Sequence, residues 1–139
     1  MGRNRGGIRL MTIHFAPLYA GLLGLIYVPL GIRIALMRKK FRVGIGDGGN
    51  PDLARAIRVH GNFMEYVPLA LVLLFAVELQ GAPAWQAHAL GLALLGARLL
   101  HIFGLGSSIG VTIGRTAGMT LTWAMILVTS ILAIRGALA

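Results

Sequence analysis

The sequence predicts an all-α membrane protein that forms a bundle of four transmembrane helices. Of the 139 residues, 57% are hydrophobic and only 12% are charged, and the mean hydropathy is +0.80, which is too apolar for a water-soluble domain of this length. About 20 apolar residues cross the roughly 30 Å of hydrocarbon in a bilayer, so we expect four spans with short connections and no soluble domain. Cysteine is absent, so any thiol chemistry must come from a ligand.

The first helix is predicted from a long run without charge. Residues 16–32 are uncharged and apolar, as is typical of a segment that enters the hydrocarbon of a bilayer. We expect the helix to continue past Arg33 to Met37 and to reach the membrane surface at the basic run RKKFR, because lysine and arginine are favoured at that level.

The second helix is predicted from its start signals. After the turn-rich stretch VGIGDGG, Asn50 is a suitable N-cap and Pro51 suits the first turn. We expect the helix to begin at Pro51 or Asp52 and to run to about Leu79. At 1.5 Å per residue it extends roughly 40 Å, which exceeds the hydrocarbon thickness. Its half from residue 55 to 65 must therefore lie at the headgroup level or among other helices.

The third and fourth helices are separated by a glycine-rich loop. A tight turn, QGAPAW, follows the second helix, and we expect the third helix over residues 84–105. The loop GLGSSIGVTIG comes next, and residues 116–134 form a run that is apolar enough for a fourth span.

Lysine and arginine near the span ends predict the orientation of the bundle. The first and third connections between helices are basic, whereas the second is uncharged. The residues concerned are Arg38, Lys39, Lys40, Arg42, Arg55 and Arg115. We therefore expect these two connections in the cytoplasm. The net charge of +9 is interpreted as anchoring to anionic membrane lipid and not as nucleic-acid binding.

The N-terminal residues conflict with this orientation. Four spans place both termini opposite the basic connections, yet the segment MGRNRGGIR adds arginines on that side. We interpret residues 1–10 as a doubtful extension, with Met11 as an alternative start. Residues 11–139 are then the membrane domain.

Four polar residues of the second helix share one face. Arg55, Arg58, Asn62 and Glu65 are three or four positions apart, which places them on one helical stripe. Ionisable residues at membrane depth point into the protein or a polar cavity, so the stripe predicts a polar site near the cytoplasmic surface. The alternative is a buried Arg58–Glu65 ion pair that only holds helices together.

The stripe belongs to a more specific pattern. RVHGNFMEYVP, residues 58–68, resembles the second-helix signature of the MAPEG family, membrane-associated proteins in eicosanoid and glutathione metabolism. The matching residues are Arg58, Asn62, Glu65, Tyr66 and Pro68. MRKKFRV and ARLLH also resemble segments of the family, and the sequence looks like its small bacterial inner-membrane branch. The resemblance implies a homotrimer that binds glutathione between subunits near the cytoplasmic face.

Glutathione carries two carboxylates and one ammonium, so its site needs guanidinium groups and an acidic acceptor. The glutathione-binding residues that we predict are Arg38, Arg55, Arg58, Asn62, Glu65, Tyr66 and His101. Arg38 and Arg58 would bind carboxylates and Glu65 the ammonium, while Asn62 can donate and accept. Arg55 can instead bind a lipid phosphate. His101 follows Arg98 by three residues, and the two either line the cleft or make ordinary contacts between helices.

Catalysis is inferred from the resemblance. Family enzymes use an arginine to stabilise the thiolate of glutathione, their co-substrate, which then attacks a lipophilic electrophile. Arg115 stands near that position, and Lys39 or Arg38 is the alternative. Arg115 can equally be an anchor at the cytoplasmic surface. Leu105 stands four residues after His101, where the eicosanoid enzymes often carry a tyrosine, which argues against the eicosanoid activities.

A second class of function stays open. The chain can be a non-catalytic membrane protein or a small transporter that moves protons or ions through Glu65. Such a carrier is expected to hold its carboxylate near the midplane with access from both sides, whereas Glu65 stands among arginines toward one face. Glu78, toward the other face, is expected to be solvated. The histidines have no metal-ligand spacing, so no metal is predicted.

Overall fold

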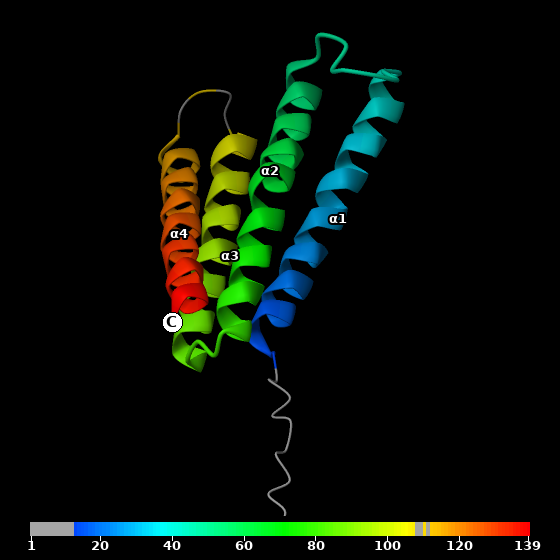
Figure 1. The fold of residues 1–139 in the computed structure, drawn as a ribbon. Helices are drawn as coiled ribbons and strands as arrows, with labels where there is room; N and C mark the ends of the chain where they lie inside the picture. The colour runs from blue at the N-terminus through cyan, green and yellow to red at the C-terminus, as the bar shows by residue number, and fades with distance from the viewer. Residues whose placement is uncertain (1–12, 108–109, 111) are drawn as a thin grey trace, which may run out of the picture.

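The computed structural model describes residues 13–107, 110 and 112–139, which contain four antiparallel helices (Figure 1). They are α1 (Phe15–Phe41), α2 (Pro51–Leu79), α3 (Ala84–Ser107) and α4 (Ile113–Leu138). Each helix is long and apolar enough to cross a membrane. The predicted bundle of four transmembrane helices is therefore confirmed, while the interpretation of residues 1–10 lies outside the described residues.

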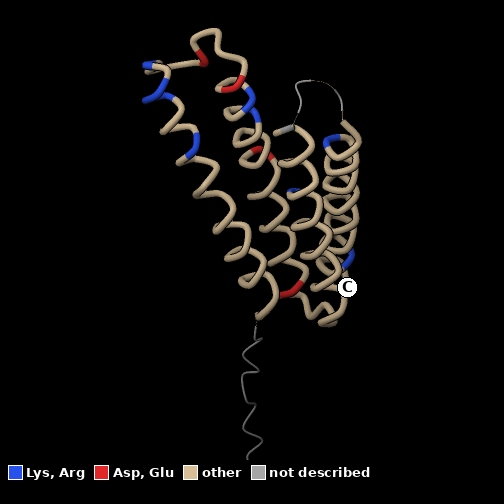
Figure 2. Tube along the Cα trace, turned by 180° about the vertical axis from the view of Figure 1, so that it is seen from behind, with Lys and Arg blue, Asp and Glu red and all other residues tan. Residues whose placement is uncertain are grey.

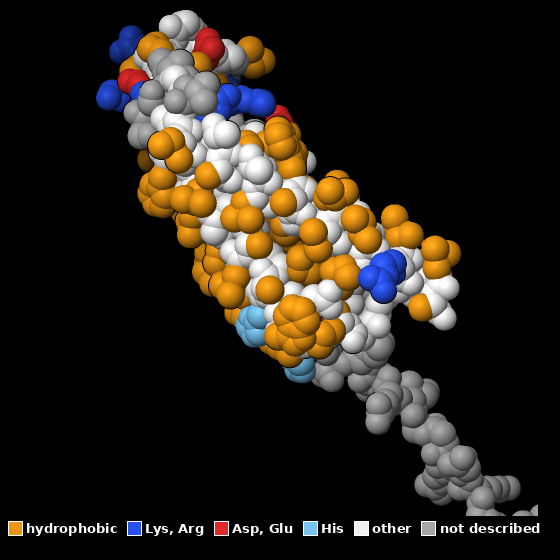
Figure 3. All heavy atoms as spheres, turned by 90° about the vertical axis from the view of Figure 1, so that its left-hand side faces the viewer, with side chains coloured by type: hydrophobic (Ala, Val, Ile, Leu, Met, Phe, Trp, Pro, Cys, Tyr) orange, Lys and Arg blue, Asp and Glu red, His pale blue; other side chains and the backbone are white. Residues whose placement is uncertain are grey.

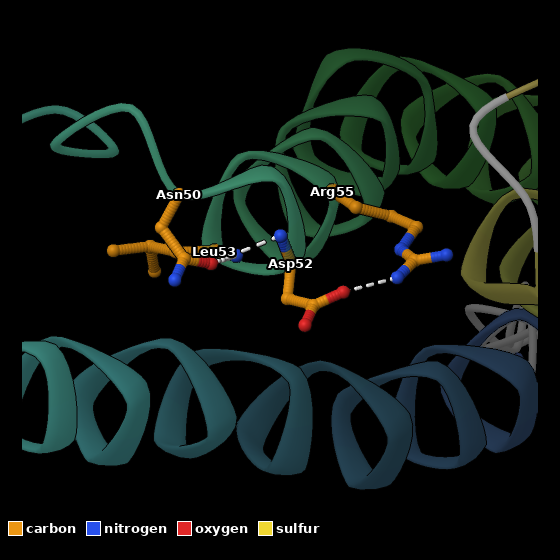
Figure 4. Close-up of polar contacts among 4 residues, drawn as sticks. All are labelled: Asn50, Asp52, Leu53 and Arg55. Carbon is orange, nitrogen blue, oxygen red and sulfur yellow. Dashed lines mark hydrogen bonds and ion pairs between the residues drawn. The ribbon is translucent and has the colours of Figure 1, made fainter.

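The start of α2 follows the predicted capping signal. The Asn50 side chain accepts hydrogen bonds from the backbone N–H groups of Asp52 and Leu53, at 3.0 Å each (Figure 4). Pro51 occupies the first turn, where its missing N–H costs no hydrogen bond. These local signals start the helix at Pro51, as predicted. The helix ends at Leu79, which also agrees with the prediction.

The other helices extend beyond their charge-free runs. α1 continues through the basic run to Phe41 and ends where Arg42 adopts a left-handed conformation with φ of 56°. Lysine and arginine are good helix formers whose charged ends can reach the membrane surface. α4 begins at Ile113, earlier than predicted, because the Thr112 side chain accepts a hydrogen bond from the backbone N–H of Arg115 at 3.2 Å and caps the helix.

The two ends of the bundle differ in charge. The α1–α2 and α3–α4 connections lie at one end, and the α2–α3 turn and the C-terminus lie at the other (Figure 1). Lysine and arginine gather at the first end (Figure 2), which we call the basic end. Arg135, in the last turn of α4, lies at the opposite end, the turn end. Between the ends, the face on the α4 side is largely hydrophobic (Figure 3), as contact with lipid requires.

One core joins all four helices, with α2 in contact with each of the others. Its buried members are Ala16, Tyr19, Leu23, Phe63, Val67, Ala70, Leu74, Val77, Leu90, Leu94 and Met125. α3 and α4 approach especially closely at Gly118. A Cβ added there would lie only 2.6 Å from the Ala97 carbonyl oxygen and 2.7 Å from the His101 backbone nitrogen. Glycine at position 118 therefore sets the α3–α4 distance.

α1 is held to the bundle at one end only. Its buried residues are Ala16, Tyr19 and Leu23, all near the turn end, and no residue of α1 after Leu23 is buried. Figure 1 shows the helix diverging from α2 toward the basic end. Within the described chain, α1 contacts α2 and α3 but not α4. The second half of α1 therefore presents apolar side chains to the surroundings.

Glu78 of α2 fixes the start of α1. Its carboxylate accepts hydrogen bonds from the backbone N–H groups of His14 at 2.7 Å, Phe15 at 2.9 Å and Ala16 at 2.7 Å. Glu78 is only 9% exposed, so the expectation that it is solvated is wrong. The first N–H groups of a helix have no partner within the helix, and at membrane depth another part of the protein must satisfy them.

We predict that Glu78→Ala weakens the attachment of α1. One hydrogen bond to a charged group contributes about 1.5–3 kcal/mol, so the free energy of unfolding should fall by at least this amount. Hydrogen exchange of the backbone amides of residues 14–16 should accelerate. Glu65→Ala, which removes an exposed carboxylate from the same helix, is the control and should leave these amides protected. Unchanged exchange in Glu78→Ala would contradict the assignment.

Candidate functional site

The predicted polar stripe of α2 divides into two sides. Asn62 is buried and Arg55 partly buried, whereas the side chains of Arg58 and Glu65 are 59% and 45% exposed. Seven residues make nearly two helical turns, so Arg58 and Glu65 stand one above the other, and so do Arg55 and Asn62. α2 therefore turns one pair toward the bundle and the other pair outward.

The outward pair forms an ion pair along α2. Arg58 Nη1 donates a hydrogen bond to Glu65 Oε1 at 2.9 Å. Both residues belong to one helix and both side chains are exposed, so the pair joins no two helices and adds little to stability. Within the protomer, the Arg58–Glu65 pair is therefore not the buried pair that holds helices together.

Arg98 of α3 lies at the centre of the bundle and is only 1% exposed. Its Nη1 donates a hydrogen bond to Asn62 Oδ1 at 2.9 Å, and its Nη2 donates to the Gly118 carbonyl oxygen at 3.3 Å and to Thr122 Oγ1. The Tyr66 ring centroid lies 5.7 Å from the guanidinium carbon, within the range of a cation–π interaction. We call these residues the Arg98 cluster. It connects α2, α3 and α4.

The sequence contains a signal for this cluster. Arg98 interrupts an apolar span, and a charged group at that depth must find hydrogen-bond partners within the protein. The spacing Arg98–His101 indicates a cleft or an ordinary helix contact, but it does not indicate which residues surround the guanidinium. Gly118 and Thr122 carry no charge and were not predicted to contribute.

A cleft at the basic end brings three predicted residues together. Its volume is about 300 Å³, and its lining residues are Pro51, Ala54, Arg55, Arg58, Leu105 and Arg115, from α2, α3 and α4. We call it the arginine cleft. Arg55 pairs with Asp52 through Nη2 (Figure 4), while its Nε is buried and has no hydrogen-bond partner within the described chain. Three guanidinium groups around one cleft favour an anionic ligand.

His101 and Tyr66 lie deeper than this cleft. His101 is 2% exposed and packs in the α3–α4 contact, where a Cβ at Gly118 would lie 2.9 Å from the His101 Cβ. Tyr66 is partly buried beside Arg98. Neither residue lines the arginine cleft, and their predicted contact with glutathione stays a prediction.

Arg38 and Lys39 lie in the last turn of α1. Lys39 is exposed, while Arg38 Nη1 is buried and has no hydrogen-bond partner in the described residues. Neither side chain lines the arginine cleft of the same protomer, because α1 diverges from the bundle toward this end. One protomer therefore does not bring Arg38 together with Arg58 in the arginine cleft.

The chain matches a known family over most of its length. A model of the MAPEG family matches residues 16–135. The chain belongs to the MAPEG family. It is 39% identical to the inner membrane protein YecN of Escherichia coli K12 over 110 residues, which cover 79% of this chain and 82% of YecN. YecN of Escherichia coli O6:H1, strain CFT073, matches to the same extent.

The arginine cleft and the Arg98 cluster both lie inside the residues that match the MAPEG family. With its four apolar helices, this MAPEG protein is a multi-pass membrane protein. Among residues 13–107, 110 and 112–139, no group of three or more His, Asp or Glu side chains has an arrangement that could hold a metal ion. The described polar residues of the site combine arginines with the Asn62 amide and the Glu65 carboxylate, a set that suits an organic ligand with both negative and positive groups.

We predict that Gly118→Ala destabilises the bundle by about 1–3 kcal/mol, the usual cost of overpacking. The added Cβ would lie closer to Ala97 and His101 than contact allows, which would move the Gly118 carbonyl away from Arg98. Gly96→Ala is the matched control, because a Cβ there meets no atom within 4 Å. Thermal denaturation in detergent should show a lower melting temperature for Gly118→Ala only. Equal melting temperatures would show that Gly118 does not set the helix distance.

Proposed function

We propose that this MAPEG protein binds glutathione at the arginine cleft and uses it as co-substrate in a transferase or peroxidase-like reaction on lipophilic electrophiles. The observation that carries the proposal is the convergence of Arg55, Arg58 and Arg115 on one cleft at the basic end. Guanidinium groups bind carboxylates through paired hydrogen bonds. A protein embedded in the bilayer also meets lipophilic substrates directly.

Glutathione carries negative charge on its carboxylates and positive charge on its ammonium, so it needs both cationic and acidic partners in the protein. We assign its carboxylates to Arg55 and Arg58, and its ammonium to Glu65, the only carboxylate of the stripe. Binding has to open the Arg58–Glu65 ion pair, which costs little because both side chains are exposed. Asn62 and Tyr66 lie along the same helix toward the bundle centre, where the peptide part of the ligand can reach them.

The reaction requires the thiolate form of glutathione. A neighbouring guanidinium lowers the pKa of a thiol, so more thiolate is present at neutral pH. We assign this role to Arg115, in the first turn of α4, where the helix N-terminus adds positive partial charge; Lys39 is the alternative. The sulfur forms a bond to the electrophilic atom of the substrate, and the displaced electron pair leaves with the departing group.

We propose that the functional unit is a homotrimer. The second half of α1 is apolar and unburied in one protomer, and Arg38 at its end does not line the arginine cleft of its own chain. A neighbouring copy can cover the apolar half of α1 and receive Arg38 at its own cleft. Helix packing in a bilayer needs such surface complementarity, because lipid tails are as apolar as the helices.

We propose that the basic end faces the cytoplasm and that the protein lies in the inner membrane, as the name of its relative YecN indicates for that protein. Lysine and arginine are enriched on the cytoplasmic side of membrane proteins and attract anionic lipid there. The arginine cleft then opens where cytosolic glutathione is present.

We predict that glutathione raises the melting temperature of the detergent-solubilised protein. Ligand at a hundred times its dissociation constant stabilises the folded state by about 2.7 kcal/mol. The control ligand is a glutathione derivative in which both carboxylates are converted to uncharged amide or ester groups. It should leave the melting temperature unchanged. A transporter that uses Glu65 for ions would be indifferent to glutathione, so an unchanged melting temperature would remove the proposal.

We predict that substitutions at the site affect glutathione binding and the reaction separately. Arg58→Ala and Glu65→Ala should each weaken glutathione binding at least tenfold, because each removes a charged hydrogen bond of about 1.5–3 kcal/mol. Arg115→Ala should leave the affinity nearly unchanged, raise the thiol pKa in the complex and slow conjugation by about 10²–10³. Isothermal titration and ultraviolet thiolate absorbance measure both quantities.

Arg135→Ala is the matched control for these variants, because Arg135 lies at the turn end. It should bind and react like the unmodified protein. Unchanged affinity in both Arg58→Ala and Glu65→Ala would remove the proposed site. An unchanged thiol pKa in Arg115→Ala would remove only the catalytic assignment of that residue.

A further inference from the structure

The Arg98 cluster determines which atom of the Asn62 side chain points away from Arg98. Arginine carries only hydrogen-bond donors, so the Asn62 atom at 2.9 Å from Arg98 Nη1 must be the amide oxygen. A reversed amide would place two donors against each other. The opposite atom, Asn62 Nδ2, makes no hydrogen bond to the described residues and is not among their fully buried unpaired atoms.

Hydrogen bonds to α4 hold the Arg98 guanidinium in place. Its Nη2 donates to the Gly118 carbonyl oxygen at 3.3 Å and to Thr122 Oγ1. The Thr122 hydroxyl donates its own hydrogen to the Gly118 carbonyl at 2.7 Å, which leaves a lone pair for the guanidinium. All these acceptors are uncharged. The buried positive charge therefore polarises the Asn62 amide and strengthens the donor character of Nδ2.

We infer that Arg98 is a positioning residue that holds the Asn62 amide with its oxygen inward, so that Asn62 meets the ligand only as a hydrogen-bond donor. This inference rests on the proposed function and adds a requirement on the ligand atom that meets Asn62. The part of the ligand that reaches Asn62 must be an acceptor oxygen, such as a peptide carbonyl or a carboxylate, and not an ammonium. The expectation that Asn62 both donates and accepts toward the ligand is then too broad.

The first test does not depend on glutathione. The chain has three asparagines, Asn4, Asn50 and Asn62, so ¹⁵N-asparagine labelling yields three side-chain amide signals. Arg98→Lys should shift the signal of Asn62. It should leave the signal of Asn50 unchanged, because Asn50 caps the start of α2 and makes no hydrogen bond to Arg98. An unmoved Asn62 signal would overturn the inference, whether or not glutathione binds.

The second test measures glutathione affinity in a double-mutant cycle. Arg98→Lys and Asn62→Ala should each weaken binding about tenfold, the loss of roughly one hydrogen bond. The double variant should bind no more weakly than Asn62→Ala alone, because Arg98 acts through Asn62. Losses that add would show that Arg98 contacts the ligand directly or acts through the fold, and would overturn the inference.

Asn62→Asp keeps the test decisive if Arg98→Lys fails to fold. The new carboxylate retains an oxygen toward Arg98 but has no N–H to offer the ligand. Its melting temperature should equal or exceed that of the unmodified protein, while its glutathione affinity should fall at least tenfold. Affinity equal to that of the unmodified protein would overturn the inference. If the unmodified protein binds no glutathione, the proposed function fails, and the amide signals still decide the role of Arg98.

Discussion

The hydrogen bonds of one buried guanidinium determine how three of the four helices pack. Arg98 is surrounded by uncharged acceptors, and a charge at this depth is stable only while those acceptors keep their positions. Asn62 must therefore face α3 from α2, and the Gly118 carbonyl must face α3 from α4. Because glycine at 118 leaves room for close approach, the carbonyl comes within reach of the guanidinium.

The same rotation of α2 produces the arginine cleft. With Asn62 turned inward, Arg55, seven residues earlier, lies on the inner side, and Arg58 and Glu65 lie on the outer side. α4 brings Arg115 to the same end, since its cap at Thr112 starts the helix there. The cleft and the Arg98 cluster are thus two consequences of one helix register, one at the membrane surface and one in the interior.

Local signals predicted the fold, and tertiary contacts account for what the sequence did not reveal. Charge-free runs and the Asn50 cap predict the number of helices and both ends of α2, because each depends on neighbouring residues only. The polar stripe of α2 is broad, so the spacing of its residues alone does not tell which of them face the bundle and which face outward. Glu78 looks like a solvated residue at a helix end, and its role follows only from the position of α1, 62 to 64 residues away.

The bundle is therefore closed at one end and open at the other. At the turn end, Glu78 caps α1 and Tyr19 packs in the core, with its hydroxyl 3.0 Å from His88 Nδ1. At the basic end α1 diverges, and its last turn carries a buried Arg38 atom that has no partner within the described chain. Most of the basic residues, the arginine cleft and the unpaired donors of Arg38 and Arg55 lie at this end, where the protomer is least closed. This coincidence supports the proposal that a ligand and a neighbouring copy complete the site at that end, because they would supply the acceptors that a single chain lacks.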